Sequence, residues 1–381
     1  MTRSSSPAHI RPAGYPGLAA AWHVWEVRKG RQPQIGGDAW DEMVSAVDGC
    51  VTQTSAWVEY ALATDYQRAV LVAGVDAEGA ARAAAVGFVS EPRWPLRGFR
   101  TMRFPAYPST CGDVDAVGEA VGVCEQVARA HGCMRIEFGG LRQPTAPSVA
   151  GLPGYATRDR LEYVVDLTCG KEELWAALNP DQRKNVKLSR TRGVYVVQAA
   201  SPVSVQVLRA LQVDVSRRHA AKGDGFGLQS PAVYDAMGRA LLGRGVARVY
   251  CALVRGAVVM AALLTTFGQR ARGISNGANE LGLETRASTA VIWHIIAQLS
   301  QEGFAELSFG TEDPVVEDPS APNHGLHKYK LELGAKLRHV TAASKDLRPV
   351  AARAYRALQQ VRARMSNGRR RTSPAQVEVE V

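Results

Sequence analysis

The stretch His131-Gly-Cys-Met-Arg-Ile-Glu-Phe-Gly139 recurs in outline as Glu302-Gly-Phe-Ala-Glu-Leu-Ser-Phe-Gly310. Gly132 corresponds to Gly303 and Phe138 to Phe309, each 171 positions later (303 − 132 and 309 − 138). A glycine that follows a helical pattern is a typical helix end, and the apolar residues after it predict a strand. The recurrence indicates that one helix-strand unit occurs twice in the chain.

The segments around this stretch repeat as well. Gly79 and Gly256 each lie between two short apolar runs, 177 positions apart (256 − 79), and both predict hairpins. Each half then runs helix, helix, hairpin, strand, helix, strand. This order predicts an α/β (α+β) fold with two tandem domains, each a mixed, largely antiparallel sheet flanked by helices.

Length agrees with two domains, because 381 residues exceed what one hydrophobic core usually holds. We expect a flexible leader over residues 1–35, domain 1 over 36–155 and domain 2 over 156–345. Residues 346–381 are expected to form a C-terminal helix and a basic tail, with domain 1 as the candidate packing partner of the helix.

Composition narrows the class of protein. The chain is 46% hydrophobic and 22% charged, as in soluble globular proteins, and its net charge of +10 favours a polyanionic partner. Six cysteines without a Cys-x-x-Cys pair predict reduced structural thiols. Without a long apolar run or a signal peptide, we expect a cytoplasmic protein with no membrane span.

Several familiar site motifs are absent. The sequence has no phosphate-binding Gly-x-x-x-x-Gly-Lys-Ser/Thr loop, no Gly-x-Gly-x-x-Gly after a strand, no His-Glu-x-x-His and no Gly-x-Ser-x-Gly. His324 and His327 could share a helical face, but no carboxylate stands at a supporting spacing. We therefore expect neither a metal nor a cofactor.

Two basic segments remain as candidate sites. Lys328 and Lys330 flank Tyr329 in Asn323-His-Gly-Leu-His-Lys-Tyr-Lys-Leu-Glu-Leu-Gly334, which follows an acidic, proline-rich loop. A second segment carries Arg183, Lys184, Lys187 and Arg190 on a predicted helix. Such cations could bind phosphates or simply form a solvated face, and the pattern alone favours neither.

Three motifs resemble the Fem family of aminoacyl-tRNA-dependent peptidyl transferases, which have two tandem acetyltransferase-like (GNAT-type) domains. Leu174-Trp-Ala-Ala-Leu-Asn-Pro-Asp-Gln-Arg-Lys-Asn-Val-Lys-Leu-Ser-Arg-Thr-Arg-Gly-Val194 resembles the family's basic helix. Val51-Thr-Gln-Thr-Ser-Ala-Trp57 is similar to its Thr-Gln…Trp segment, and Gly325-Leu-His-Lys-Tyr-Lys330 to its Gly-Leu-x-x-Phe-Lys turn. The likeness covers about residues 38–345.

This resemblance implies an enzyme whose donor is aminoacyl-tRNA, with Lys330 stabilising the oxyanion or the terminal phosphate of the donor. It implies that Tyr234 lies on the acceptor side. Further candidates for substrate contacts are Ser230, Ser275, Asn276 and Arg218. Candidates for tRNA phosphate contacts are Arg183, Lys184, Lys187, Arg190, Arg217 and Lys328.

Other positions differ from the family pattern. Family members that bind UDP-linked muramyl peptides have cations where this chain has Glu59, Ala61 and Ser230, and an acidic residue at Gly139. Fewer cations leave a diphosphate without neutralising groups. The expected acceptor is therefore the amine of a peptide or small molecule, as in peptide or nucleoside antibiotic biosynthesis.

Three alternatives stay open. One is an aminoacyltransferase that builds interpeptide bridges on peptidoglycan precursors, and another is an acyl-CoA-dependent N-acyltransferase on the same fold. The segment 276–289 lacks the usual pyrophosphate-binding pattern and carries Glu280 and Glu284, which argues against coenzyme A. The third is a non-catalytic RNA-binding or scaffold protein.

Overall fold

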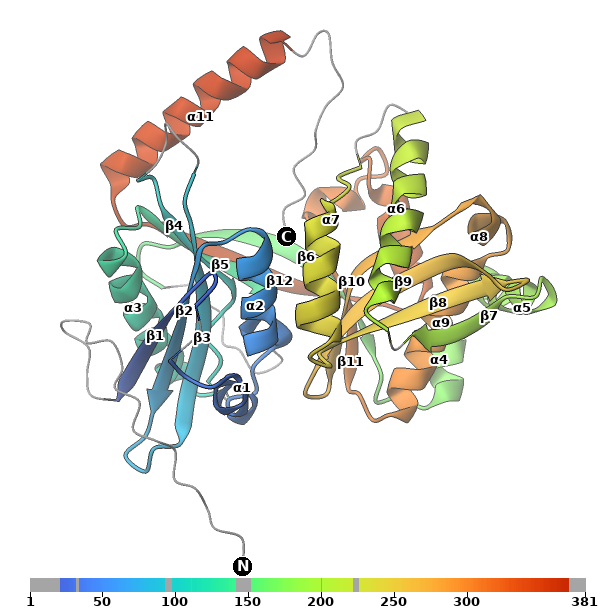
Figure 1. The fold of residues 1–381 in the computed structure, drawn as a ribbon, viewed down its shortest axis with the longest axis horizontal. Coiled ribbons are helices and arrows are strands. Elements are labelled where there is room, and N and C mark those ends of the chain that lie inside the picture. The colour runs from blue at the N-terminus through green and yellow to red at the C-terminus, as the bar shows by residue number, and fades with distance from the viewer. Residues whose placement is uncertain are drawn as a thin grey trace, which may run out of the picture. The chain divides into compact units, whose positions relative to one another are not determined.

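The computed structural model describes residues 21–31, 34–92, 98–110, 112–141, 152–199, 201–221 and 226–369 (Figure 1). The chain divides into two compact units. Unit 1 comprises the residues up to Thr157 and a returning segment, Ala343–Arg353. Unit 2 comprises Arg158–Ala342 and the residues from Ala354 onward.

Unit 1 is a six-stranded mixed sheet. Its order is β1-β2-β3-β4-β5-β12, in which only β4 and β5 are parallel. The strands are β1 (Trp22–Arg28), β2 (Arg68–Val75), β3 (Ala81–Ser90), β4 (Thr101–Ala106), β5 (Arg135–Leu141) and the end of β12 (Lys336–Asp346). The helices are α1 (Gly37–Ala46), the 3-10 turn η1 (Val51–Gln53), α2 (Ser55–Thr64) and α3 (Val114–Ala130). The core lies between α3 and the sheet and includes Val72, Phe104, Val121, Ile136 and Phe138.

The leader expected over residues 1–35 is not loose throughout, because it contains β1. All seven residues of β1 pair with β2, from Trp22 opposite Gly74 to Arg28 opposite Arg68. Apolar residues of the strand, Val24 among them, are buried against the core. Burial of this face explains why the segment is ordered although its flanks are rich in glycine, proline and arginine.

The Thr-Gln…Trp segment has a structural role in unit 1. Gln53 is buried, and its side-chain amide donates to the carbonyls of Ala84 and Tyr107, both at 3.1 Å. Its side-chain oxygen accepts from the Ser109 hydroxyl at 2.7 Å and from the Cys50 amide at 3.0 Å. Thr54 caps α2 by accepting from the Trp57 amide. A fully satisfied buried amide of this kind fixes the loop before α2 onto β3.

Unit 2 repeats the same plan. Its order is β12-β6-β11-β10-β9-β8-β7, with β10 and β11 as the parallel pair. The strands are β6 (Ala156–Asp166), β7 (Tyr195–Ala199), β8 (Ala247–Val254), β9 (Ala257–Phe267), β10 (Arg270–Ala278) and β11 (Glu306–Glu312).

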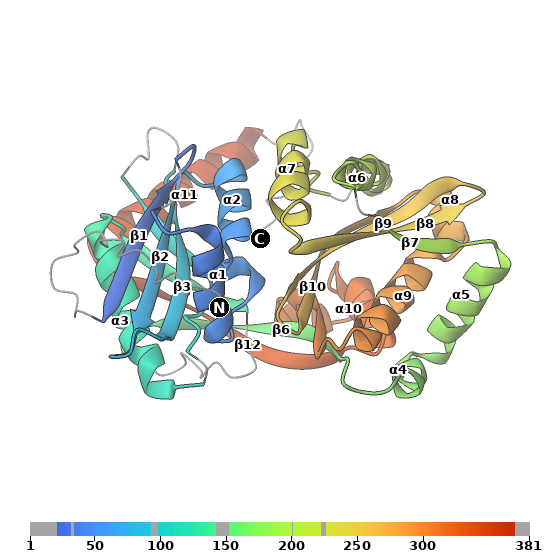
Figure 2. The ribbon, with the colours of Figure 1, turned by 60° about the horizontal axis from the view of Figure 1, so that its bottom comes forward.

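Helices cover both faces of this sheet. In Figure 2, α6 (Val203–Ala221) and α7 (Pro231–Ala236), which the π-helical turn η2 (Met237–Leu242) extends, lie on one side. On the other side lie α4 (Lys171–Ala177), α5 (Pro180–Thr191), α9 (Ala287–Gln301) and α10 (His324–Glu332). The remaining helices are α8 (Glu280–Glu284), the 3-10 turn η3 (Pro314–Glu317) and α11 (Pro349–Arg369). The core of unit 2 includes Tyr250, Val291, Ile295 and Leu299.

The internal duplication is confirmed strand by strand. In each unit a hairpin turns at a glycine with positive φ, +84° at Gly79 and +81° at Gly256. In each unit a helix also ends at a positive-φ glycine, Gly132 or Gly303, before the second parallel strand. The sixth strand is supplied differently: β6 follows β5 in sequence but pairs with β11, and the end of β12 pairs with β5. The sequence predicted the C-terminal helix, with domain 1 as its candidate packing partner, but not the pairing of Ala343–Asp346 with β5.

None of the helices in the described part of the chain is both long and apolar enough to span a bilayer. The basic tail expected after α11 lies outside the described residues.

Candidate functional site

The parallel strands of unit 2 part after three residue pairs. Their last pair joins Arg272 of β10 to Ser308 of β11. Beyond it β10 is irregular between Gly273 and Ser275, and β11 between Ser308 and Thr311. Parallel strands end at the same edge of a sheet, and that edge is where open α/β sheets bind ligands. This edge is therefore the candidate site.

A bulge in β11 decides which side chains face the site. Ser308 stands opposite Val164 of β6, but Thr311 stands opposite Glu162, so β11 has one more residue than its partner. One extra residue reverses the alternation of side chains between the two faces. Gly310 has a φ of +88°, which glycine adopts without strain. As a result Glu312, opposite Leu161, lies on the same face of the sheet as Tyr163.

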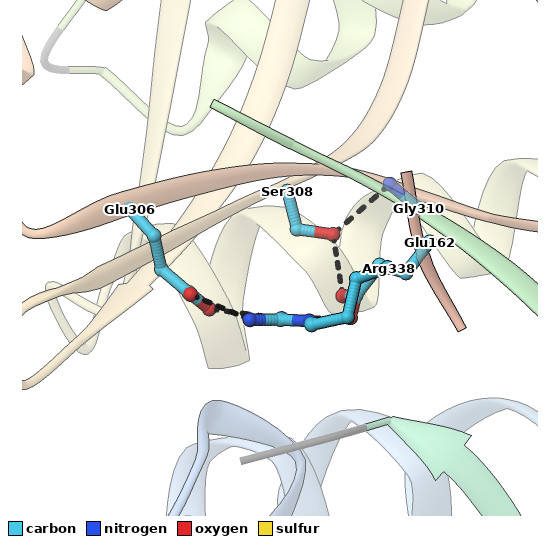
Figure 3. Close-up of polar contacts among 5 residues, drawn as sticks. All are labelled: Glu162, Glu306, Ser308, Gly310 and Arg338. Carbon is cyan, nitrogen blue, oxygen red and sulfur yellow. Dashed lines mark hydrogen bonds and ion pairs between the residues drawn. The ribbon is translucent and has the colours of Figure 1, made fainter. Parts of the chain in front are cut away.

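The other face holds a charged network beside the bulge (Figure 3). Arg338 of β12 donates to Glu162 at 2.7 and 3.1 Å and to Glu306 at 2.9 and 3.3 Å. The Ser308 hydroxyl donates to Glu162 at 2.7 Å and accepts from the Gly310 amide at 3.2 Å. Burial disfavours the charged guanidinium, but the two carboxylates outweigh this and raise the pKa of Arg338. The network thus fixes the bulge to β6 and β12.

Lys330, the predicted catalytic residue, lies on α10 with its side chain only 11% exposed. Its ammonium donates to the Glu312 carboxylate at 2.9 Å and lies 4.5 Å from the centre of the Tyr163 ring. An ammonium has three N–H donors, and among the described residues Glu312 is its sole hydrogen-bond acceptor. Two donors are thus available to a bound group.

Two histidines complete this cluster. The Tyr163 hydroxyl and Nδ1 of His327 are 2.7 Å apart, and His327 stacks on His324 with ring centres 5.6 Å apart. Burial, with the negative charge of Glu312 and Glu317, raises the pKa of Tyr163 to about 12, so the phenol keeps its proton. Nδ1 of His324 lies 2.9 Å from the Val316 carbonyl. In the described part of the chain no three or more His, Cys, Asp or Glu side chains are grouped as a metal site.

The predicted acceptor-side residues meet through a residue that the sequence did not single out. Gln212 of α6 accepts from the Tyr234 hydroxyl and donates to the Ser275 hydroxyl at 2.6 Å and to the Asn276 carbonyl at 3.0 Å. Tyr234 is only 1% exposed, Ser275 is half-buried, and Asn276 and Ser230 are exposed. The cluster joins α6 and α7 to β10, and the exposed side chains are the ones that can meet a ligand.

The arginines of α6 and Lys328 differ in their surroundings. Arg218 donates to the Ala278 carbonyl at 2.6 Å and therefore braces the end of β10. Arg217 is exposed and pairs with Asp214 at 3.2 Å. Lys328 is exposed, 3.8 Å from Glu332. Surface pairs of this kind are weak, so both cations remain available to an anion.

One cation of the basic helix α5 forms hydrogen bonds within the fold, and the other three face solvent. Arg183 donates to the carbonyls of Ala176 and Leu178, both at 2.8 Å, and so caps α4. The other three are exposed, and we call Lys184, Lys187 and Arg190 the α5 cationic face.

Helix α5 is also fixed to the helix that carries Lys330. The Asn179 amide donates to the Glu332 carbonyl at 2.9 Å, and the Gln182 side chain donates to the Glu332 carboxylate at 2.8 Å. Gln182 also accepts from the Thr289 hydroxyl at 3.0 Å in the first turn of α9. The start of α9 is therefore covered by α5, with Ala287 and Thr289 buried.

Two departures from the family pattern have a steric reason in unit 1. A Cβ atom at Gly139 would lie 2.2 Å from the Pro105 carbonyl oxygen, so no acidic side chain fits there. Ala61 is buried in α2, which leaves little room for a lysine. Glu59, by contrast, is exposed.

Glu312, Tyr163 and Gln212 are the site residues that sequence reasoning missed. A signal existed for Glu312, because it opens the acidic segment directly after the repeated stretch that ends in Gly310. Tyr163 and Gln212 carry no local signal, since their roles depend on contacts with distant parts of the chain.

Comparison with known proteins places the fold. Residues 181–331 match the family model of the acetyltransferase (GNAT) domain. The crystal structure of FemX aligns with a TM-score of 0.70 at 13% identity, covering 84% of this chain and 98% of that one. The fold prediction is confirmed: the chain has a Fem-like fold with GNAT-type units.

Two further structures share this fold. One is the C-terminal domain of a putative lysylphosphatidylglycerol synthetase from Agrobacterium fabrum, with a TM-score of 0.52, 14% identity and coverage of 83% and 96%. The other is a conserved protein of unknown function from Bacteroides thetaiotaomicron, with a TM-score of 0.55, 12% identity and coverage of 82% and 98%. No curated protein matches the chain. The domain match supports an acyltransferase as the class of enzyme.

Proposed function

We propose that the protein transfers an amino acid from aminoacyl-tRNA to the amine of a peptide or small-molecule acceptor, forming an amide. The observation that carries this proposal is the ammonium of Lys330, which is nearly buried, is held by Glu312 and has two N–H donors to offer. Glu312 belongs to the part of β11 beyond its last residue pair with β10.

The bonds that form and break in this reaction belong to the substrates, and the protein mainly stabilises the charge that develops. The acceptor amine attacks the ester carbonyl and forms a C–N bond, and negative charge grows on the carbonyl oxygen. The C–O bond to the ribose then breaks, and the leaving oxygen takes the proton that the amine loses. A fixed ammonium that donates to the developing oxyanion lowers the barrier, because this charge is largest in the transition state.

Features of unit 2 support tRNA as the donor. The α5 cationic face offers exposed positive charge, and hydrogen bonds to Glu332 join its helix to the one that carries Lys330. Coenzyme A, in contrast, needs free backbone N–H groups for its pyrophosphate at a helix start. The start of α9 is covered by Gln182, and α8 before it carries Glu280 and Glu284.

Two exposed positions lack the positive charge that diphosphate-binding members of the family that the chain resembles have there: Glu59 in unit 1 and Ser230 in unit 2. Ala61 of unit 1 is buried. We therefore propose an acceptor without a diphosphate, such as a peptide or amine intermediate of antibiotic biosynthesis in the cytoplasm. The exposed Asn276 and Ser230 are its proposed contacts, on a wall built by Tyr234, Ser275 and Arg218.

The test is transfer from charged tRNA to candidate amines, read by mass spectrometry. Lys330→Met removes the ammonium and keeps the length of the side chain. We expect turnover to fall by about 10²–10³, the usual effect of one lost oxyanion donor. Lys336→Met, an exposed lysine in the same unit, is the matched control. Near-normal turnover by a folded Lys330→Met variant would show that this mechanism is wrong.

A second candidate is an acyl-CoA-dependent N-acyltransferase, which the GNAT-domain match favours. Ribonuclease separates the two, since it abolishes product only when tRNA is the donor. Product that survives ribonuclease and requires acyl-CoA would replace the proposal. RNA binding without transfer to any amine would instead indicate a binding protein, and peptidoglycan precursors belong in the same acceptor screen.

A further inference from the structure

The Lys330 ammonium is in contact with both a carboxylate and an aromatic ring. A carboxylate lies at 2.9 Å and an aromatic ring centre at 4.5 Å, and both come from strands of the sheet. A lysine side chain is long and flexible, and it loses rotamer entropy when it is fixed. Two strand residues that hold its end reduce the number of positions that the ammonium can occupy.

The strands also fix the two partners relative to each other. Glu312 of β11 stands opposite Leu161 of β6, two residues from Tyr163 on the same face. The bulge at Gly310 is what moves Glu312 to this face, and the Ser308–Glu162 hydrogen bond holds the bulge. Groups on paired strands are placed more rigidly than groups on loops.

Charge is the second consideration. With a side chain only 11% exposed, the ammonium has little water around it. A poorly hydrated cation is stabilised by a counter-charge and by the negative face of an aromatic ring. Both compensations come from strands of the sheet, and of the two only Glu312 accepts a hydrogen bond from the ammonium.

We propose that Glu312 and Tyr163 are positioning residues that hold the Lys330 ammonium in place, leaving two N–H donors for the reacting carbonyl. The proposal rests on the proposed function, because it concerns the group that acts there. Tyr163 acts through its ring, and its hydroxyl is engaged with His327.

The experiment is a double-mutant cycle between Glu312→Gln and Lys330→Met, with kcat and KM measured for both substrates. Glu312→Gln alone is expected to lower kcat by about 10- to 100-fold, in line with a small misplacement of a catalytic group, with KM nearly unchanged. In the Lys330→Met background it should change kcat by less than about twofold, because a residue that acts only through Lys330 has nothing left to position. Glu172→Gln removes the same charge from an exposed position on α4 of the same unit and is the control.

Two tyrosine variants test the ring. Tyr163→Phe keeps the ring and loses the hydroxyl, whereas Tyr163→Leu loses both. The ring argument requires a clearly larger loss of kcat in the leucine variant. Thermal unfolding of each variant separates misfolding from misplacement.

The possible results distinguish this inference from the proposed function. If Lys330→Met is inactive but Glu312→Gln is fully active, the positioning role is wrong and the oxyanion role stands. If Glu312→Gln still lowers kcat in the Lys330→Met background, Glu312 acts independently and the inference fails. If Lys330→Met turns over normally, both fail.

Discussion

Replacing Arg338 tests how much the buried charged network stabilises unit 2. The change is Arg338→Met, which keeps an unbranched apolar stem and removes the guanidinium. It would leave Glu162, only 3% exposed, without its cation. The Ser308 hydroxyl would remain as a neutral partner of the carboxylate.

The expected cost follows from that burial. Removing one partner of a buried ion pair costs about 3–5 kcal/mol, because the remaining charge stays desolvated. The main segment of unit 2, Arg158–Ala342, has 185 residues (342 − 158 + 1). In domains of this size 1 kcal/mol corresponds to roughly 2–4 °C in Tm, so the expected loss is about 6–20 °C.

Calorimetry of three variants checks this account. Glu306→Gln should cost only about 1 kcal/mol, because Arg338 keeps its bonds to Glu162. Adding Glu162→Gln to Arg338→Met removes the buried charge and should recover much of the lost stability. A Tm loss below about 3 °C for Arg338→Met, or strict additivity in the double variant, would refute the reasoning.

Other expectations concern separate parts of the chain. Replacing all three residues of the α5 cationic face by Gln should weaken tRNA binding and lower the slope of log K against log salt by up to about 2–3. An unchanged slope would show that this face does not bind tRNA phosphates. Tyr234→Phe leaves the Gln212 side-chain oxygen without its hydrogen-bond donor and should lower stability by about 1–3 kcal/mol, with little change in the KM of the acceptor. A large change in KM would mean that the Tyr234 hydroxyl contacts the substrate. Gly139→Ala places a Cβ atom 2.2 Å from the Pro105 carbonyl oxygen and should cost on the order of 1–3 kcal/mol, and a variant as stable as the parent would show that β4 can move.

Local signals carried most of the fold prediction. Glycines at hairpins and helix ends were readable because positive φ leaves a residue-specific mark, as at Gly79 and Gly303. The basic helix was predicted from its cations and from the resemblance of its segment to a known family. The structure adds that Asn179 accepts a hydrogen bond from the Asp181 amide at the start of α5. A repeated local pattern is enough to predict a repeated topology.

Features that depend on contacts between distant residues have weaker signals in the sequence. Trp22–Arg28 contains two tryptophans and two valines, which favour a strand, but glycine and proline on either side suggested a leader. Glu312 depends on one extra residue in β11, which shifts a side chain to the other face without changing composition. Gln212 meets Tyr234 and Ser275 from 22 and 63 positions away, and no single-sequence pattern records such a contact.

The late return of residues 343–353 to unit 1 bears on how the protein is made. During synthesis the edge of β5 stays without its final neighbour until Ala343–Asp346 has left the ribosome, long after the rest of unit 1. An open strand edge is a template for wrong pairing with other chains. A nascent chain that stalls between residue 157 and residue 343 would therefore carry an unpaired β5 edge that can pair with other chains.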